Sequence, residues 1–240
     1  MSGAIELSPS SWRQRMPREG SPAREAVVDS VATRVIESGT GRVTVAIDGF
    51  SAAGKTNFGH ELARTLSARG RQVLRASLDD FKRPWDEADQ YDRTSGEGYY
   101  RNAFDYDAVR RLLLDPARPG GSGRAALCAI DPITQVDRSD RLVRMRDDAV
   151  VVVDGVFTMR PELDGEWDVR VWLDVDAELS VKRAIARDAK MVGGARAAED
   201  VQRNRYLASE LIYIDECDPR HHADVVIDNS QLDDPKVERI

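Results

Sequence analysis

Residues 43–56 read VTVAIDGFSAAGKT, and this stretch decides the fold. It opens with a short apolar run at 43–47 and continues into the pattern G-x-x-x-x-G-K-[ST] at 49–56. Apolar residues then recur at helical spacing to about residue 68. The stretch therefore predicts a buried strand, a glycine-rich turn and a helix from about 55 to 68, which is the structural context that the pattern requires.

The glycine-rich turn has the composition of a phosphate-binding loop. Glycines let the backbone curl so that successive N–H groups point into one concavity, and the helix N-terminus adds a favourable dipole. We expect Lys55 to reach the β- and γ-phosphates of a nucleoside triphosphate and the Thr56 hydroxyl to ligate Mg²⁺. The alternative, a chance match, should occur in on the order of one chain in a hundred of this length. The predicted nucleotide-binding residues are Gly49, Phe50, Ser51, Ala52, Ala53, Gly54, Lys55 and Thr56.

Further apolar segments extend this unit into a layered fold. Strands rich in Val and Ile that alternate with helices predict a parallel sheet covered on both faces. The expected architecture is therefore a three-layer α/β/α fold of the P-loop NTPase type, with a mainly parallel five-stranded sheet. Besides 43–47, strands are expected at 73–77, 149–153, 169–173 and 223–227, and helices at about 24–37, 107–114 and 177–212.

The chain is expected to form one domain. Residues 1–22 mix Ser, Pro, Arg and Gly without periodicity, which predicts a flexible N-terminal tail before a single domain at 23–240. Residues 82–102 are rich in Asp, Arg, Gly and Tyr and are expected to cross over the active site. Gly193-Gly194 interrupts the charged helical stretch, so we expect a helical lid at about 183–206.

Length, composition and charge narrow the class of protein. The 240 residues are 41% hydrophobic and 32% charged, with a formal net charge of -7. An acidic chain is a poor partner for nucleic acid or anionic lipid, so a phosphate ligand must be held by a local site. The chain shows neither a secretory signal nor a run of ~20 apolar residues, so we expect a cytoplasmic protein with no membrane partner. Whether it forms a homo-oligomer is left open.

Carboxylates follow two of the predicted strands, at the edge where ligands gather in such sheets. Asp154 follows the most apolar strand and is the candidate second ligand of Mg²⁺, the alternative being a turn Asp before Gly155. Asp79 and Asp80 follow the strand at 73–77. One of them could orient an acceptor hydroxyl and take its proton, the alternative being a helix N-cap.

Basic residues in the lid are candidates for binding a transferring phosphoryl group. Arg183 and Arg187 lie four residues apart and share a helix face. The alternative for this stretch is a solvated helix whose basic residues pair with Asp188, Glu199 and Asp200. We expect that alternative to hold for most other basic residues there, including Arg203 and Arg205.

With these residues assembled, the chain resembles the uridine kinase and phosphoribulokinase branch of the P-loop kinases. The resemblance implies a small-molecule kinase with ATP or GTP as donor and a hydroxyl as acceptor. It places the catalytic acid on Asp79, beside the metal site with Thr56 and Asp154, and the lid arginines on Arg183 and Arg187. The matching segments lie at 47–56, 78–81 (Leu-Asp-Asp-Phe), 102–105 (Asn-Ala-Phe-Asp), 153–157 (Val-Asp-Gly-Val-Phe), 183–188 and 223–227.

The segments that would recognise the acceptor depart from the uridine kinase pattern. Residues 98–101 carry no acid to bind ribose hydroxyls, and residues 130–135 keep an Asp but lack the Tyr and His of that pattern. The acceptor could therefore be a sugar, a pantothenate-like alcohol or another metabolite, and a nucleotide-binding switch without transferase activity is the alternative from another class. Candidate acceptor-binding residues are Tyr99, Tyr100, Arg101 and Asp131.

Overall fold

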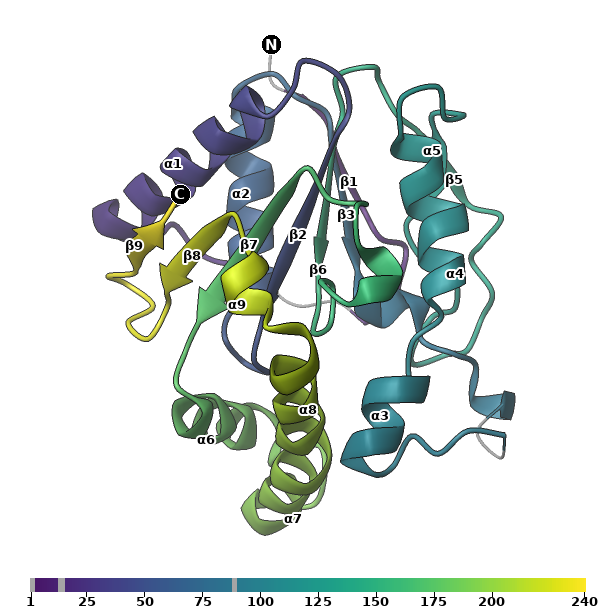
Figure 1. The fold of residues 1–240 in the computed structure, drawn as a ribbon, viewed down its shortest axis with the longest axis vertical. Helices are drawn as coiled ribbons and strands as arrows, with labels where there is room; N and C mark the ends of the chain where they lie inside the picture. The colour runs from purple at the N-terminus through teal and green to yellow at the C-terminus, as the bar shows by residue number, and fades with distance from the viewer. Residues whose placement is uncertain (1–2, 13–15, 88–89) are drawn as a thin grey trace.

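The fold is built around one twisted sheet (Figure 1), seen in a computed structural model that describes residues 3–12, 16–87 and 90–240. Within these residues the sheet has seven strands in the order β1-β3-β6-β2-β7-β8-β9. Neighbouring strands are parallel, except that β9 runs antiparallel to β8. The strands are β1 (Ile5–Leu7), β2 (Val43–Gly49), β3 (Val73–Ser77), β6 (Val150–Asp154), β7 (Val169–Asp174), β8 (Val225–Asp228) and β9 (Lys236–Arg239), with β4 (Arg124–Ala126) and β5 (Leu142–Arg144) pairing separately.

The predicted three-layer α/β/α architecture is confirmed, and the five predicted strands correspond to β2, β3, β6, β7 and β8. The central strands β2, β3 and β6 are buried almost throughout because both faces of the sheet are covered. On β6, Val150 and Val152 belong to one hydrophobic cluster, whereas Val151 and Val153 belong to the other. The sheet is larger than predicted because two short strands extend it at its edges.

One of these edge strands lies where the sequence predicted a flexible tail. Ile5–Leu7 pairs in parallel with β3, and the Val73 amide donates to the Ala4 carbonyl over 2.8 Å. Three residues are too few to produce a readable alternation pattern, so the strand depends on pairing with β3 and not on its own sequence. Residues 1–2 and 13–15 of the predicted tail lie outside the described residues.

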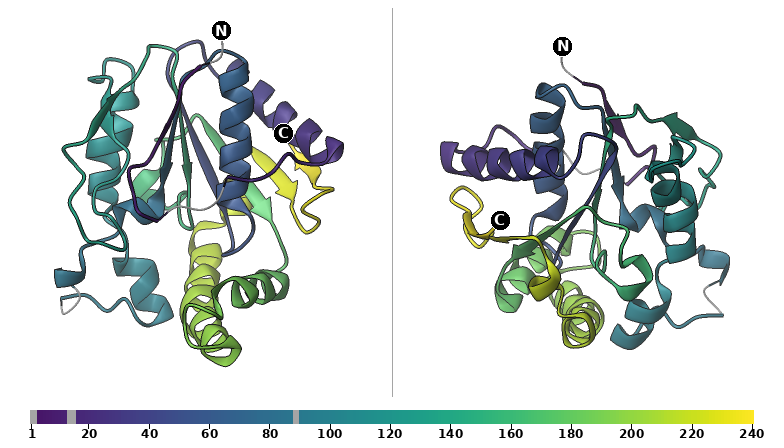
Figure 2. Two further views of the ribbon diagram at one scale, coloured as in Figure 1. Left: turned by 180° about the vertical axis from the view of Figure 1, so that it is seen from behind. Right: turned by 45° about the horizontal axis from the view of Figure 1, so that its top comes forward.

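Helices cover the two faces of the sheet. On one face α1 (Pro22–Glu37) and α2 (Lys55–Ala68) pack together, as both views in Figure 2 show. The other face is covered by α3 (Gly96–Asn102), α4 (Tyr106–Val109) with the π-helical segment Arg110–Leu114, and α5 (Asp115–Ala117). Short 3-10 helices lie at Leu78–Phe81, Trp85–Glu87 and Pro161–Leu163.

The charged stretch after β7 forms a group of helices beyond the carboxyl ends of the strands, at the lower end of the molecule in Figure 1. They are α6 (Ala177–Asp188), α7 (Ala195–Val201), the π-helical segment Gln202–Leu207 and α8 (Ala208–Cys217). The short α9 (Pro219–His222) follows α8 and lies back at the sheet, against β7. Gly193 and Gly194 separate α6 from α7, where the sequence predicted a break. In the part of the chain that the structure describes, no helix has the length and apolar character needed to cross a membrane.

Candidate active site

The predicted phosphate loop connects β2 to α2 and has a backbone conformation that favours glycine. Gly49 has a φ of 145° and Gly54 a φ of 99°. A Cβ added to Gly49 would lie 2.5 Å from the Leu173 carbonyl oxygen, and one added to Gly54 would lie 2.8 Å from the Asn229 side-chain nitrogen. Any other residue at either position would have to displace the loop. The loop therefore keeps the narrow curve that directs backbone N–H groups toward phosphate oxygens.

A buried polar network supports the loop from behind. Asn229, which follows β8, donates to the Ala53 carbonyl over 2.6 Å. Its side-chain oxygen accepts from Arg24 over 3.0 Å, and Arg24 pairs with Glu61 at 2.8 Å. Since each member of such a network strengthens the next in a low-dielectric interior, the network ties α1, α2 and the end of β8 to one loop carbonyl.

Lys55 begins α2 and contacts the loop that precedes it. Its ammonium group donates to the Gly49 and Phe50 carbonyls over 2.8 and 2.7 Å. Burial lowers the pKa of Lys55, and this effect is opposed by the carboxylates of Glu210 and Asp48. The cation therefore lies inside the curve of the loop, where phosphate oxygens would bind.

The two predicted Mg²⁺ ligands lie in direct contact. The Thr56 hydroxyl donates to Asp154 over 2.6 Å, from the first turn of α2 to the end of β6. The other Asp154 oxygen is 2.6 Å from the Arg75 guanidinium, which is itself buried and donates to the Val152 carbonyl over 2.8 Å. Across residues 3–12, 16–87 and 90–240, no group of three or more His, Cys, Asp or Glu residues is arranged to hold a metal. A hydroxyl and a carboxylate at this position fit Mg²⁺ that is shared with phosphate oxygens.

Asp79 lies across the same cavity, after the end of β3. Its carboxylate is 2.8 Å from the Lys82 ammonium group. Burial raises the pKa of Asp79, but the charge of Lys82, its hydrogen bond, and the charges of Lys55 and Arg187 outweigh this effect and hold the pKa below its usual value. The cavity has a volume of about 560 Å³, and Lys55, Thr56, Asp79 and Asp154 all line it.

The neighbouring Asp80 is absent from the walls of that cavity. Its side chain is 3% exposed. Burial raises its pKa to about 7, although hydrogen bonds with Ser8 and Ser10 oppose the shift. Asp80 thus faces the N-terminal segment, and of the two adjacent acids only Asp79 faces the phosphate loop.

Both lid arginines line the cavity but have partners of their own. Arg187 pairs with Asp188 at 2.6 Å. Arg183 donates to the Ser230 carbonyl over 2.7 Å and more weakly to the Asn229 carbonyl. A role in phosphoryl transfer would require each guanidinium to exchange these partners for phosphate oxygens.

Glu210 is a site residue that the sequence analysis did not identify. It lies on α8, is 4% exposed, and accepts from the Ser51 amide of the loop over 2.7 Å. Burial raises its pKa to about 7, against the opposing effect of Lys55. One helical turn further on, Tyr213 donates to Asp48 over 2.8 Å. The one feature of the sequence that could have indicated this role is the i, i+3 spacing of Glu210 and Tyr213, which places both on one face of α8.

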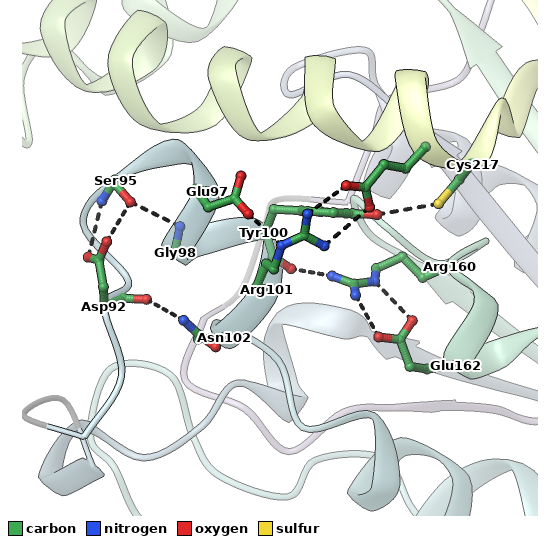
Figure 3. Close-up of polar contacts among 11 residues, drawn as sticks. Asp92, Ser95, Glu97, Gly98, Tyr100, Arg101, Asn102, Arg160, Glu162 and Cys217 are labelled. Atoms are coloured by element: carbon green, nitrogen blue, oxygen red, sulfur yellow. Dashed lines mark hydrogen bonds and ion pairs between the residues drawn. The ribbon is translucent and has the colours of Figure 1, made fainter.

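The predicted acceptor-binding residues are only partly brought together. Tyr99 lines the cavity, but Tyr100, Arg101 and Asp131 do not. Figure 3 shows the Tyr100 hydroxyl beside Cys217, at 3.4 Å, and Arg101 bound to Glu97 and a second carboxylate. That carboxylate belongs to Glu216, 2.6 Å from Arg101.

Asp131 is likewise occupied by structural contacts. It is fully buried, and its two oxygens accept from the Ser11 hydroxyl over 2.6 Å and the Ser11 amide over 2.7 Å. It also accepts from the Ile133 and Thr134 amides, each over 3.0 Å. Three of the four predicted acceptor contacts are therefore corrected, since these side chains join structural elements and do not face the cavity.

The strand–loop–helix unit, the Thr56–Asp154 pair and the helical group beyond the sheet define the class of protein, which is that of the P-loop kinases. A family model described as "Phosphoribulokinase / Uridine kinase family" matches residues 44–234. The chain belongs to this family and is a small-molecule kinase.

Relatives and solved structures agree with this assignment. The chain is 26% identical over 193 residues to a uridine kinase of Limosilactobacillus reuteri, covering 77% of this chain and 82% of the relative. It is 27% identical over 164 residues to a uridine kinase of Staphylococcus haemolyticus, covering 68% and 75% of the two chains. A structure described as that of a "Possible Uridine Kinase" from Bacillus stearothermophilus has a TM-score of 0.63 and 25% identity, covering 83% of this chain and 96% of the other.

Proposed function

We propose that the chain transfers the γ-phosphoryl group of ATP, with Mg²⁺, to a hydroxyl group of a small metabolite. The observation that carries this proposal is the shared cavity, in which the phosphate loop, the Thr56–Asp154 pair and Asp79 face one another. Phosphoryl transfer needs these three components in one place: a phosphate cradle, a metal site and a carboxylate for the acceptor hydroxyl.

Each component has a defined task in this proposal. Lys55 and the loop amides hold the β- and γ-phosphates, and Thr56 and Asp154 hold Mg²⁺, which neutralises charge on the phosphate oxygens. Asp79 accepts a hydrogen bond from the acceptor hydroxyl and orients its oxygen toward the γ-phosphorus. Because Lys82 lowers the pKa of Asp79, this carboxylate is a weak base, and its main contribution is orientation.

The lid supplies cations to the phosphoryl group as it transfers. Arg183 and Arg187 lie on α6, and the segment beyond it begins at Gly193 and Gly194, with φ of 91° and 117°. A Cβ added to either glycine would meet nothing within 4 Å, so neither is held by packing. We therefore propose that this pair is the hinge of the lid at about 183–206, about which α7 closes over the phosphates, while Arg183 and Arg187 on α6 already line the cavity.

Coupled release of the nucleoside diphosphate tests this function, as ADP with ATP as donor and as GDP with GTP, with nucleosides, sugars and pantothenate as acceptors. ADP release should depend on an acceptor, and Lys55→Ala and Asp79→Asn should lower kcat by at least about 100-fold, the scale of one lost catalytic group. Lys236→Ala is the matched control, because Lys236 is exposed on β9 and, among the described residues, its ammonium group pairs with Asp234 alone. Wild-type rates in the Lys55→Ala protein, or ADP release that no acceptor stimulates, would refute the proposal.

A further inference from the structure

A second hollow, of about 710 Å³, adjoins the cavity around Asp79. Lys82, Tyr99 and Pro132 line both spaces and form the wall that they share. We call the second space the acceptor hollow, defined by Lys82, Tyr91, Arg93, Tyr99, Pro132 and Arg205. Because Lys82 contacts Asp79 and lines the hollow as well, an acceptor whose hydroxyl lies at Asp79 can extend past this wall into the hollow.

Arg205, on the π-helical segment before α8, is the most distinctive group in this hollow. Its guanidinium carbon lies 4.6 Å from the ring centroid of Tyr99 and 5.3 Å from that of Tyr206. Its Nε atom is buried and has no hydrogen-bond partner among the described residues. No ion pair joins Arg205 to any carboxylate that the structure describes. The Arg205 side chain lines the hollow without a carboxylate partner, so an anionic group of a ligand bound there would gain a charge-assisted hydrogen bond.

Lys82 places a second cation at the shared wall. Its ammonium group is 2.8 Å from Asp79, 5.7 Å from the centroid of Tyr99 and 5.6 Å from that of Phe104. Asp79 uses one oxygen in this contact, and the ammonium group has three donors. Lys82 can therefore bind a second oxyanion while it remains paired with Asp79.

The acids near the hollow balance these charges only in part. Asp79 pairs with Lys82, and Asp92 lines the hollow, where its oxygens accept from the Thr94 amide over 2.8 Å and from the hydroxyl groups of Thr94 and Ser95. Arg93, also in the wall, donates to the Arg83 carbonyl over 2.7 Å. Among the described lining residues, Arg93 and Arg205 therefore stand against Asp92 alone, which leaves an excess of positive charge in a chain whose formal net charge is -7. A local excess of positive charge on an acidic protein attracts a small anion.

We propose that the acceptor is an alcohol that carries an anionic group, a carboxylate or a phosphate, which Arg205 and Lys82 bind in the acceptor hollow. The proposal rests on the proposed kinase function and names the class of its acceptor. A neutral nucleoside or sugar would leave Arg205 without a counter-charge, since Lys82 is already paired with Asp79, and residues 98–101 offer no acid for ribose hydroxyls. A carboxylate or phosphate matches the paired N–H donors of a guanidinium group.

The test compares acceptors in matched pairs that differ only in the anionic group. The pairs are pantothenate and pantothenol, glycerate and glycerol, ribose 5-phosphate and ribose, with uridine added as the neutral nucleoside. The anionic member of at least one pair should have a kcat/KM at least about 10-fold above that of its neutral partner, and a carboxylate or phosphate preference identifies which group is bound.

A substitution then assigns the preference to Arg205. Arg205→Met should reduce the preference for the anionic acceptor by about 10- to 100-fold, through KM more than kcat, and leave the KM for ATP unchanged. Arg205→Lys should restore part of it. Arg203→Met is the control, because Arg203 lies on the same segment, is exposed and pairs with Glu178 and Glu199 at 2.8 and 3.0 Å. Stabilisation by ATP, followed as a rise in Tm, verifies that each variant is folded.

The outcomes separate the two proposals. If neutral acceptors are used as well as their anionic partners, or if Arg205→Met leaves the preference unchanged, the anionic acceptor is refuted and the kinase function stands. If the wild-type protein binds ATP but no acceptor stimulates ADP release, the kinase function is refuted, and the anionic acceptor with it.

Discussion

Replacing Glu210 by Gln should stabilise the protein at alkaline pH and leave its stability nearly unchanged at acid pH. The amide oxygen of Gln can still accept from the Ser51 amide, which lies 2.7 Å from the carboxylate in the structure. Only the buried negative charge is lost. The substitution therefore separates the charge of Glu210 from its hydrogen bond.

The size of the effect follows from the pKa of Glu210. Burial raises that pKa from 4.5 to about 7, so the folded state holds the proton more tightly than the unfolded state. The free energy of unfolding must then fall as the pH rises from 4.5 to 7, and the loss is complete above 7. At about 1.4 kcal/mol per pH unit, the charge costs up to about 3 kcal/mol at pH 8. This is an upper value, because Lys55 loses a neighbouring carboxylate.

Urea unfolding at pH 5 and pH 8 measures the effect. Wild type and Glu210→Gln should differ by less than about 1 kcal/mol at pH 5, whereas the variant should be more stable by about 1–3 kcal/mol at pH 8. Asp80, whose pKa is also raised to about 7, is present in both proteins and cancels in the comparison. A variant that is less stable at pH 8, or equally stabilised at both pH values, would show that the charge of Glu210 is not destabilising.

Other substitutions test the remaining parts of the site. Arg75→Met should lower the free energy of unfolding by about 3–5 kcal/mol, because it leaves the buried Asp154 without its cation; a loss below about 1 kcal/mol in urea unfolding would contradict this. Asn229→Ala should cost about 1–3 kcal/mol in the same assay and raise the KM for ATP, since a loop carbonyl loses its donor, and an unchanged KM would contradict its supporting role. Replacing both Gly193 and Gly194 by Ala should strain two positions of positive φ by about 1–3 kcal/mol each. The double variant should have a lower kcat while its Tm shows that it is still folded, and an unchanged kcat would argue against a hinge.

The central fold could be predicted because it depends on local patterns. The strands β2, β3 and β6 are buried on both faces, and β6 therefore appears in the sequence as a continuous apolar run, while β2 and β3 are mostly apolar. The start of α2 was fixed by the glycine-rich loop before it. The edge strands were missed for the opposite reason, because β1 has three residues and all four residues of β9 are exposed. These two strands form because they pair with the sheet, and their own sequences carry no strand pattern.

Candidate site residues could be named where they belong to a motif or follow the end of a strand. The loop residues, Asp79 and Asp154 were identified as candidates in this way, and Lys55, Asp79 and Asp154 line one cavity in the structure. Glu210, Arg75 and Asn229 were missed because they reach their partners over 159, 79 and 176 residues of sequence, at no motif spacing. The direction in which a side chain points cannot be read from the sequence either. For this reason Asp131 was predicted to face an acceptor, although it binds Ser11.

The contact between Ser11 and Asp131 has a practical consequence for work on this protein. Trp12, the next residue, lines the cavity, and the turn that Asp131 holds carries Pro132 and Ile133, which line it too. A shortened version that begins at Ala23, the predicted start of the domain, would remove β1, the part of the cavity wall that Trp12 forms, and the contact of Ser11 with Asp131. Trimming the N-terminus for crystallisation should therefore alter catalysis, and affinity tags are better attached at the other end of the chain.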